Sequence, residues 1–136
     1  MTIPYRIFHI ETKQFAIFPE LFENGAAVDV NSSYGFALGM DLSTVKCGSR
    51  FNYVQGGKTL LILELHVSFQ IAEEGISEIK KKGVIPVDFL RYMATIVVGT
   101  ARGIIHTKTE GTVLNSVVLP PVNLVETITD DLKIEQ

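Results

Sequence analysis

Residues 111–124, Gly-Thr-Val-Leu-Asn-Ser-Val-Val-Leu-Pro-Pro-Val-Asn-Leu, decide how this chain ends and which class of fold it forms. An apolar run is stopped by Pro120 and Pro121, because proline has no N–H to donate to a β-ladder. Asn123 then begins a predicted helix as its N-cap, with Glu126 three residues later in the reciprocal capping arrangement. The apolar stripe of this final helix consists of Leu124, Val125, Ile128 and Leu132.

A longer helix is predicted before this segment, over residues 87–102. Its apolar residues recur at three- and four-residue steps, which is the period of a helix packed on a core. Gly103 is suited to end it in the left-handed conformation, and residues 104–119 are predicted to be extended. The apolar side comprises Phe89, Leu90, Met93, Ile96, Val97 and Ala101. The polar side comprises Asp88, Arg91, Tyr92, Thr95, Gly99 and Arg102.

The first half of the chain has the two-residue period of strands. Residues 5–18 alternate with a break at the polar residues 11–14, and Phe8 and Ile10 are placed on the face opposite Tyr5 and Ile7. Both faces are thus partly apolar, which predicts a strand with a core on one side and a partner subunit on the other. Pro19 ends it, and a loop is predicted over 20–33. The next strand begins at residue 34, with one apolar face formed by Tyr34, Phe36, Leu38, Met40 and Leu42.

Two further strands are predicted on either side of a tight turn. Gly48 and Ser49 are expected to separate a short strand, 50–54, from the one before it. Gln55-Gly56-Gly57 has the composition of a hairpin turn, because glycine adopts positive φ without steric cost. Residues 58–71 then form a long strand whose apolar face is Leu61, Leu63, Leu65, Val67, Phe69 and Ile71.

Strands first and helices last predict an α+β fold: a four-stranded antiparallel sheet with a long helix and a C-terminal helix on one face. A chain of 136 residues with 46% hydrophobic and 20% charged residues fits one globular domain over residues 1–136. The net charge of −3 does not predict nucleic-acid binding. No apolar run is long enough to span a membrane, and no signal peptide precedes the first strand, so a soluble cytoplasmic protein is expected.

The residues that usually carry catalysis or bind metals are scattered. His9, His66 and His106 have no ligand spacing, and Cys47 is a single cysteine expected to be buried, so neither a metal site nor a cofactor is predicted. Residues 56–59, Gly-Gly-Lys-Thr, resemble the end of a phosphate-binding loop but precede a strand instead of a helix.

Asp88 is the one carboxylate that offers an enzymatic alternative. In the first turn of a helix it favours the helix dipole. The alternative role is the general base of a hot-dog-like acyl thioesterase, or a residue of an acyl-binding protein.

The chain resembles the SecB family of protein-export chaperones in two places. Residues 8–17, Phe-His-Ile-Glu-Thr-Lys-Gln-Phe-Ala-Ile, are similar to the first strand of the family. Arg102-Gly103 followed by residues 119–124, Leu-Pro-Pro-Val-Asn-Leu, is the stronger match. The resemblance implies no enzyme but an ATP-independent holdase, a homotetrameric dimer of dimers that holds unfolded client polypeptides in apolar grooves. By the same resemblance, the peptide-binding residues would be Phe18, Phe22, Phe36, Leu124 and Ile128.

The chain departs from the family where clients are delivered to the SecA-type translocase motor. The acidic positions of the first strand are Gln14 and Phe18 here, and the acidic tail is shortened to residues 130–136. Ile62 and Glu64 are the apolar and acidic pair that remains for binding the motor. The alternative partner is an antitoxin, for which the chain would be a dedicated SecB-like chaperone.

Overall fold

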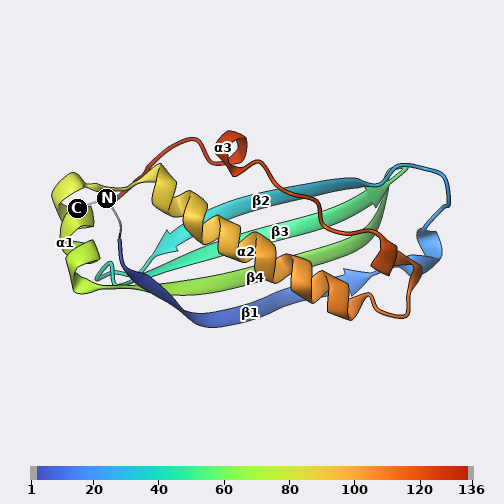
Figure 1. Cartoon of the computed structure of the whole chain (residues 1–136), viewed down its shortest axis with the longest axis horizontal. Coiled ribbons are helices and arrows are strands. Elements are labelled where there is room, and N and C mark those ends of the chain that lie inside the picture. Colours follow the sequence, from blue (N-terminus) through green and yellow to red (C-terminus); the bar gives the residue numbers. More distant parts are fainter. Residues whose placement is uncertain (1–2, 135–136) are drawn as a thin grey trace.

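The structure, a computed structural model, describes residues 3–134 and contains a four-stranded antiparallel sheet with helices on one face (Figure 1). The strand order is β1-β4-β3-β2, so that β1 and β2 form the two edges. The α+β class and the four strands predicted from the sequence are confirmed. The strands are β1 Tyr5–Ile17, β2 Asp29–Leu38, β3 Thr44–Gln55 and β4 Lys58–Ile71.

A long helix, α2, crosses one face of the sheet diagonally, and the C-terminal segment follows it back on the same face (Figure 1). At one end of the sheet a short helix and a two-strand ladder connect β4, α2 and the C-terminus. The helices are α1 Glu73–Lys82, α2 Val87–Lys108 and α3 Leu124–Thr127, with 3₁₀ turns η1 Pro19–Leu21 and η2 Val113–Ser116. The small ladder pairs β5, Val84–Ile85, with β6, Leu132–Lys133.

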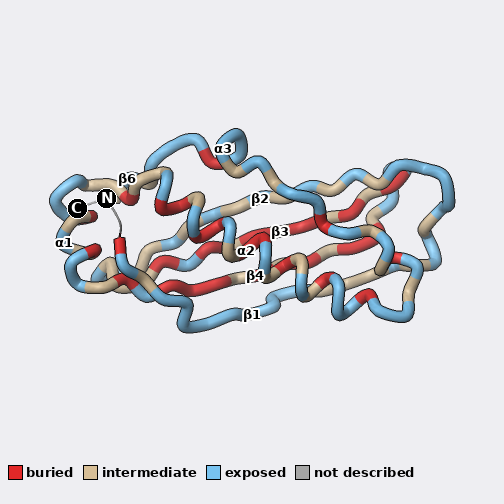
Figure 2. Tube along the Cα trace, in the orientation of Figure 1, coloured by how far each residue is buried: buried red, intermediate tan, exposed pale blue. Residues whose placement is uncertain are grey.

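The core lies between α2 and the two inner strands. The predicted apolar face of β4 is confirmed, and it meets the buried side of α2. Figure 2 shows buried residues along β3 and β4, while most of β1 is exposed. Fully burying one large aliphatic or aromatic side chain contributes roughly 1.5–3 kcal/mol, so this layer accounts for most of the hydrophobic stabilisation. The buried residues of α2 are Phe89, Leu90, Met93, Ala94, Val97, Val98, Ala101 and Ile105.

Two β-bulges in β1 change the face of the sheet to which the following side chains point. The register with β4 shifts between Ile7 and His9 and again between Thr12 and Gln14. A bulge inserts one extra residue, so the following side chains change face. Ile10 therefore opposes Val67, on the face that carries α2, together with Tyr5, Ile7, Phe15 and Ile17. The simple alternation predicted for residues 5–18 placed Ile10 on the opposite face, and that assignment was wrong.

The boundaries of β2 and β3 differ from the predicted ones. β2 already begins at Asp29, inside the predicted loop, and ends before Met40 and Leu42. Both of these residues lie in the turn that follows, where Leu42 has a φ of 63°. β3 runs through Gly48 and Ser49 without a break, since Gly48 pairs with Gly35 on one side and His66 on the other. The predicted hairpin turn is confirmed, with φ of 55° at Gly56 and 77° at Gly57.

The helical region also differs from the prediction. α2 continues through Gly103 to Lys108, because the apolar period extends to the buried Ile105. The left-handed glycine after it is Gly111, at φ 81°. Residues 104–119 are thus not one extended segment. The final helix has four residues and ends at Thr127, so Ile128 and Leu132 of the predicted stripe lie beyond it. Asn123 is its N-cap as predicted, accepting a hydrogen bond from the Glu126 backbone N–H at 3.2 Å, but among the described residues no return bond from the Glu126 side chain accompanies it. Within residues 3–134, no helix is both long and apolar enough to cross a bilayer.

Candidate functional site

The C-terminal segment 117–134, called the strap below, is fixed to α2 by two arginines. The first is Arg102, whose Nε donates to the Leu119 carbonyl at 2.9 Å and whose Nη2 donates to the Pro120 carbonyl at 3.1 Å. The buried Tyr53 of β3 adds a third bond, from its hydroxyl to the Val117 carbonyl at 3.2 Å. The start of the strap is therefore held by its main chain.

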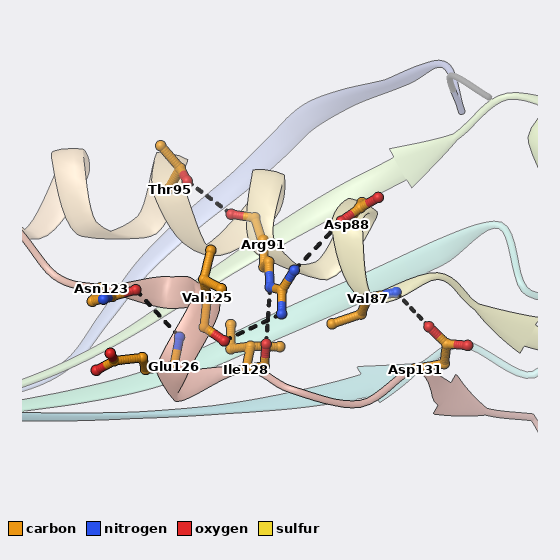
Figure 3. A network of polar contacts seen from close by, with 9 residues as sticks. All are labelled: Val87, Asp88, Arg91, Thr95, Asn123, Val125, Glu126, Ile128 and Asp131. Atoms are coloured by element: carbon orange, nitrogen blue, oxygen red, sulfur yellow. Dashed lines mark hydrogen bonds and ion pairs between the residues drawn. The ribbon is translucent and has the colours of Figure 1, made fainter.

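Arg91 repeats this arrangement about three helical turns earlier on α2. Its Nε donates to the Ile128 carbonyl at 2.9 Å and its Nη2 to the Val125 carbonyl at 3.2 Å (Figure 3). Asp88 lies 3.5 Å from Nη1 and helps to orient the guanidinium. A hydrogen bond to a charged group is worth about 1.5–3 kcal/mol, so the two arginines are substantial anchors.

The far end of the strap is tied to the start of α2. The Asp131 carboxylate accepts from the Val87 backbone N–H at 2.7 Å (Figure 3), which satisfies one of the free donors at a helix N-terminus. Beyond it, β6 pairs with β5, and the Ile134 N–H donates to the Gly83 carbonyl at 3.1 Å. Most of these polar anchors hold main-chain atoms of the strap, and the buried side chains of Leu119 and Ile128 add apolar anchors in the core.

An apolar strip on β2 lies on the same face as the strap. Its side chains are partly buried, as are several from the loop before β2 and from the strap itself. Burial raises the pKa of the Tyr34 hydroxyl. The β2 members are Val30, Tyr34, Phe36 and Leu38; Phe22, Val28, Val117, Val122 and Leu124 come from the loop and the strap.

Of the five residues predicted to bind peptide, Phe22, Phe36 and Leu124 belong to this strip and Ile128 belongs to the core. Phe18 lies outside the strip at the end of β1, where its backbone N–H donates to the Leu60 carbonyl of β4 at 2.8 Å. Phe18 and Phe22 flank η1, beyond the start of β2. Phe36 lies seven residues along β2 from Asp29, which is about 23 Å in an extended strand, while Leu124 and Ile128 belong to the strap. Phe18 is 37% exposed, whereas Ile128 is only 8% exposed and is part of the core. Ile128 is thus an anchor of the strap more than a free contact surface.

Ile62 and Glu64, predicted to bind a motor protein, lie on the opposite, open face of the sheet. The Glu64 carboxylate is 2.9 Å from Arg50 Nη1 on β3, so its charge is neutralised within the sheet. Gln14 of β1 is its other cross-strand neighbour and contributes no charge. This face therefore lacks a cluster of free carboxylates around Glu64.

The remaining candidates from the sequence are Cys47, Asp88 and the residue types that bind metals. Cys47 is buried in β3, and burial raises its thiol pKa to about 12. Asp88 is in the first turn of α2 and its side chain is 81% exposed, which fits the helix-terminal role. It lies at a pocket that Tyr5, Phe89 and Tyr92 also line. Among the described residues, no three His, Cys, Asp or Glu side chains converge as metal ligands.

One feature of the site was not deduced from the sequence. Arg91 and Arg102 were assigned to the polar side of the helix without a partner, although both are bound to the strap. A signal was available, since arginines on the side of a helix that faces an irregular segment often donate to free carbonyls. The first half of β1 carries exposed apolar surface, as the two apolar faces of residues 5–18 predicted: Ile7, Phe8 and Ile10 are 43%, 50% and 49% exposed.

The comparisons with known proteins agree with this fold. No protein-family model and no curated protein matches the chain. Among solved structures, the chain is similar to the Mycobacterium tuberculosis SecB-like chaperone Rv1957, in complex with a ChAD peptide from the HigA1 antitoxin. The TM-score is 0.53 at 12% sequence identity, over 88% of this chain and 90% of that one. The chain therefore has a divergent SecB-like fold, as the sequence resemblance implied.

Proposed function

We propose that the chain is an ATP-independent holdase that binds unfolded or partly folded polypeptides along the strip between β2 and the strap. The observation that carries the proposal is the construction of this strip. Its aromatic and aliphatic side chains are half-buried, and one wall, the strap, is held by main-chain bonds to Arg91 and Arg102. Apolar side chains left partly uncovered beside a fixed wall suit an extended apolar segment of another chain.

The same strip is expected to bind many different polypeptides. A site that selects one ligand uses polar groups placed to match it, whereas this strip offers mainly apolar contacts. Phe18, Phe22, Phe36 and Leu124 are the proposed contact residues, with Ile128 fixing the strap beneath them. The thioesterase alternative has weaker support, because Asp88 is 81% exposed and paired with Arg91 at 3.5 Å.

A homotetramer is the proposed assembly. The middle of β1 exposes Ile7, Phe8 and Ile10, and the outer side of α2 carries Gly99 and Gly103 next to the exposed Tyr92. Apolar side chains and small residues on two separate surfaces are what a dimer of dimers needs, because it has two different interfaces.

The dedicated chaperone of one antitoxin is the second candidate function, and one observation favours it. The chaperone of similar fold was solved with a peptide from an antitoxin. Delivery to a translocase motor through Ile62 and Glu64 is the less supported branch, because Glu64 is already paired with Arg50.

The test is suppression of aggregation of a chemically unfolded model protein, without nucleotide, with the mass of the chain in solution measured alongside. We expect suppression at about one tetramer per client. No suppression by a folded tetramer would reject the general holdase; selective binding of one antitoxin segment in the same assay format would then support the dedicated chaperone.

A further inference from the structure

The two edges of the sheet are built differently. β1 contains two bulges, and it carries Arg6, Glu11 and Lys13. Bulges and charged side chains are the usual means by which an edge strand is prevented from pairing with another chain. The β1 edge is protected in this way.

β2 has none of these protections. Its register with β3 is continuous from Asp29 to Leu38, without a bulge. It contains no proline, lysine or arginine, and Asp29 at its first position is its only charged residue. By the rules for sheet edges, such a strand is a template for the addition of a further strand.

The main chain of β2 is available for this pairing. Within the described residues, its main-chain hydrogen bonds go to β3, and no loop or strap residue bonds to its outer side. None of its residues is buried: exposed and half-buried positions alternate along its whole length. Every second residue of an edge strand directs its N–H and C=O outward, at a spacing that only another extended main chain matches.

Two arguments decide what pairs there. The outer edge of β2 continues directly into the apolar strip, so a strand added to it would place alternate side chains beside Tyr34, Phe36 and Leu38. Its other side chains would lie beside the small residues Ser33, Gly35 and Ala37. One edge thus serves both the main chain and the apolar side chains of an extended polypeptide.

A second copy of the chain fits the edge less well. In Figure 1, α3 projects beyond β2, above the position where the next strand would lie. A copy paired through its own β2 would bring a second α3 to the same side of the same junction. A single extended segment brings no such element.

We propose that β2 is a strand-addition site, at which an extended client segment with alternating apolar residues pairs with the outer edge from Asp29 to Leu38. This deepens the holdase proposal and rests on it. It adds a main-chain component to the affinity, which is independent of the client sequence and explains breadth by hydrogen bonds as well as by apolar contact.

The experiment uses a nine-residue probe of alternating threonine with leucine or phenylalanine, blocked at both ends, and two N-methylated forms. One form is methylated at the apolar positions and the other at the threonines. In strand addition, the N–H groups of either the apolar residues or the threonines donate to β2, but not both. We therefore expect one methylated form to lose at least tenfold in affinity and the other to bind nearly as the unmethylated probe does. Equal affinities of the two forms would overturn strand addition, and failure of all three probes, with no suppression of aggregation, would instead overturn the holdase.

A protein variant provides the second measurement. Asn31→Lys places a charge on the exposed side of β2, where its cross-strand neighbour is the neutral Asn52. Gln14→Lys is the matched control, on the exposed side of the opposite edge. We expect Asn31→Lys to lower the affinity for the unmethylated probe at least fivefold, with unchanged mass in solution. Gln14→Lys should leave this affinity unchanged. A fall in mass for Asn31→Lys alone would show that the edge pairs with a second copy and would overturn the proposal.

Discussion

Arg91 and Ile128 are joined across α2 and the strap by a hydrogen bond of 2.9 Å between the guanidinium Nε and a main-chain carbonyl. The Ile128 side chain is buried in the core at the same point. One residue of the strap is thus held twice, by its carbonyl on the helix and by its side chain in the core. This double attachment fixes the wall of the proposed binding strip.

Replacing Arg91 should loosen the strap without unfolding the sheet. Arg91→Ala removes bonds to the carbonyls of Ile128 and Val125, and we expect a loss of about 1–3 kcal/mol in local stability. Hydrogen exchange should accelerate over residues 123–134 and stay unchanged in β3 and β4. Arg91→Lys is the control, because a single ammonium cannot replace the two-pronged contact and should restore only part of the protection. Uniform acceleration across the sheet would contradict this role.

Cys47 should react only when the protein opens. Burial raises its pKa to about 12, so the thiolate fraction at pH 8 is about one part in ten thousand. We expect labelling by iodoacetamide to be negligible in the native protein and fast in denaturant. The measurement is mass spectrometry over time, and rapid native labelling would show that β3 is exposed by local opening.

Stability should fall at alkaline pH. Burial raises the pKa of Tyr53 from 10.0 to about 12 and that of Cys47 from 9.0 to about 12. The unfolded state therefore loses protons between about pH 9 and pH 12 that the native state retains, so the free energy of unfolding decreases as pH rises. Each such group contributes up to about 1.4 kcal/mol per pH unit. Tyr53→Phe should be less stable at pH 7, through loss of its bond to Val117, and should show a shallower alkaline fall in denaturant titrations.

The sequence predicted the bounds of an element well where a single hydrophobic period ran through it. β4 was predicted at its observed bounds, Lys58–Ile71, because its alternation is uninterrupted and one face is fully buried. α2 was found but ended too early, because Gly103 was taken as a stop. A glycine in a helix costs only about 1 kcal/mol, and the burial of Ile105 two residues later offsets it.

The sequence predicted which elements form the site but not how their side chains contact one another. The aromatic content of β2 and the apolar strap residues were recognised, yet the bonds from Arg91 and Arg102 depend on where α2 crosses the sheet. The sequence indicated a break in β1 at residues 11–14, where the second bulge lies, but the first bulge, at Phe8, was not predicted. Both features arise from tertiary packing, which a local pattern does not contain.

The glycines of α2 provide a test of the assembly. A Cβ at Gly99 or at Gly103 would meet nothing within 4 Å, so the fold of one chain does not require either glycine. Gly99→Ala should even stabilise the isolated fold by about 0.8–1 kcal/mol, through helix propensity. If another subunit packs closely there, the larger Gly99→Leu should lower the mass in solution while the protein stays folded. An unchanged mass for Gly99→Leu and Gly103→Leu would remove this surface from the assembly.

Phe36 is the residue whose replacement should separate client binding from folding. It is half-buried on β2 and packs against the edge of the core, while the inner strands keep their own apolar contacts. Phe36→Ser should therefore cost less than the roughly 3–5 kcal/mol of a fully buried phenylalanine, leaving a folded protein. Because the apolar strip loses one of the two aromatic side chains that β2 contributes to it, we expect at least a fivefold loss in suppression of client aggregation. Phe8→Ser is the matched control, since Phe8 is 50% exposed on β1, away from the strip. The two variants should therefore change different quantities. Phe8→Ser should change the mass in solution, and Phe36→Ser should change the affinity for clients. If both weaken client binding equally at unchanged mass, clients bind along exposed apolar surface in general and the strip beside the strap is not their site.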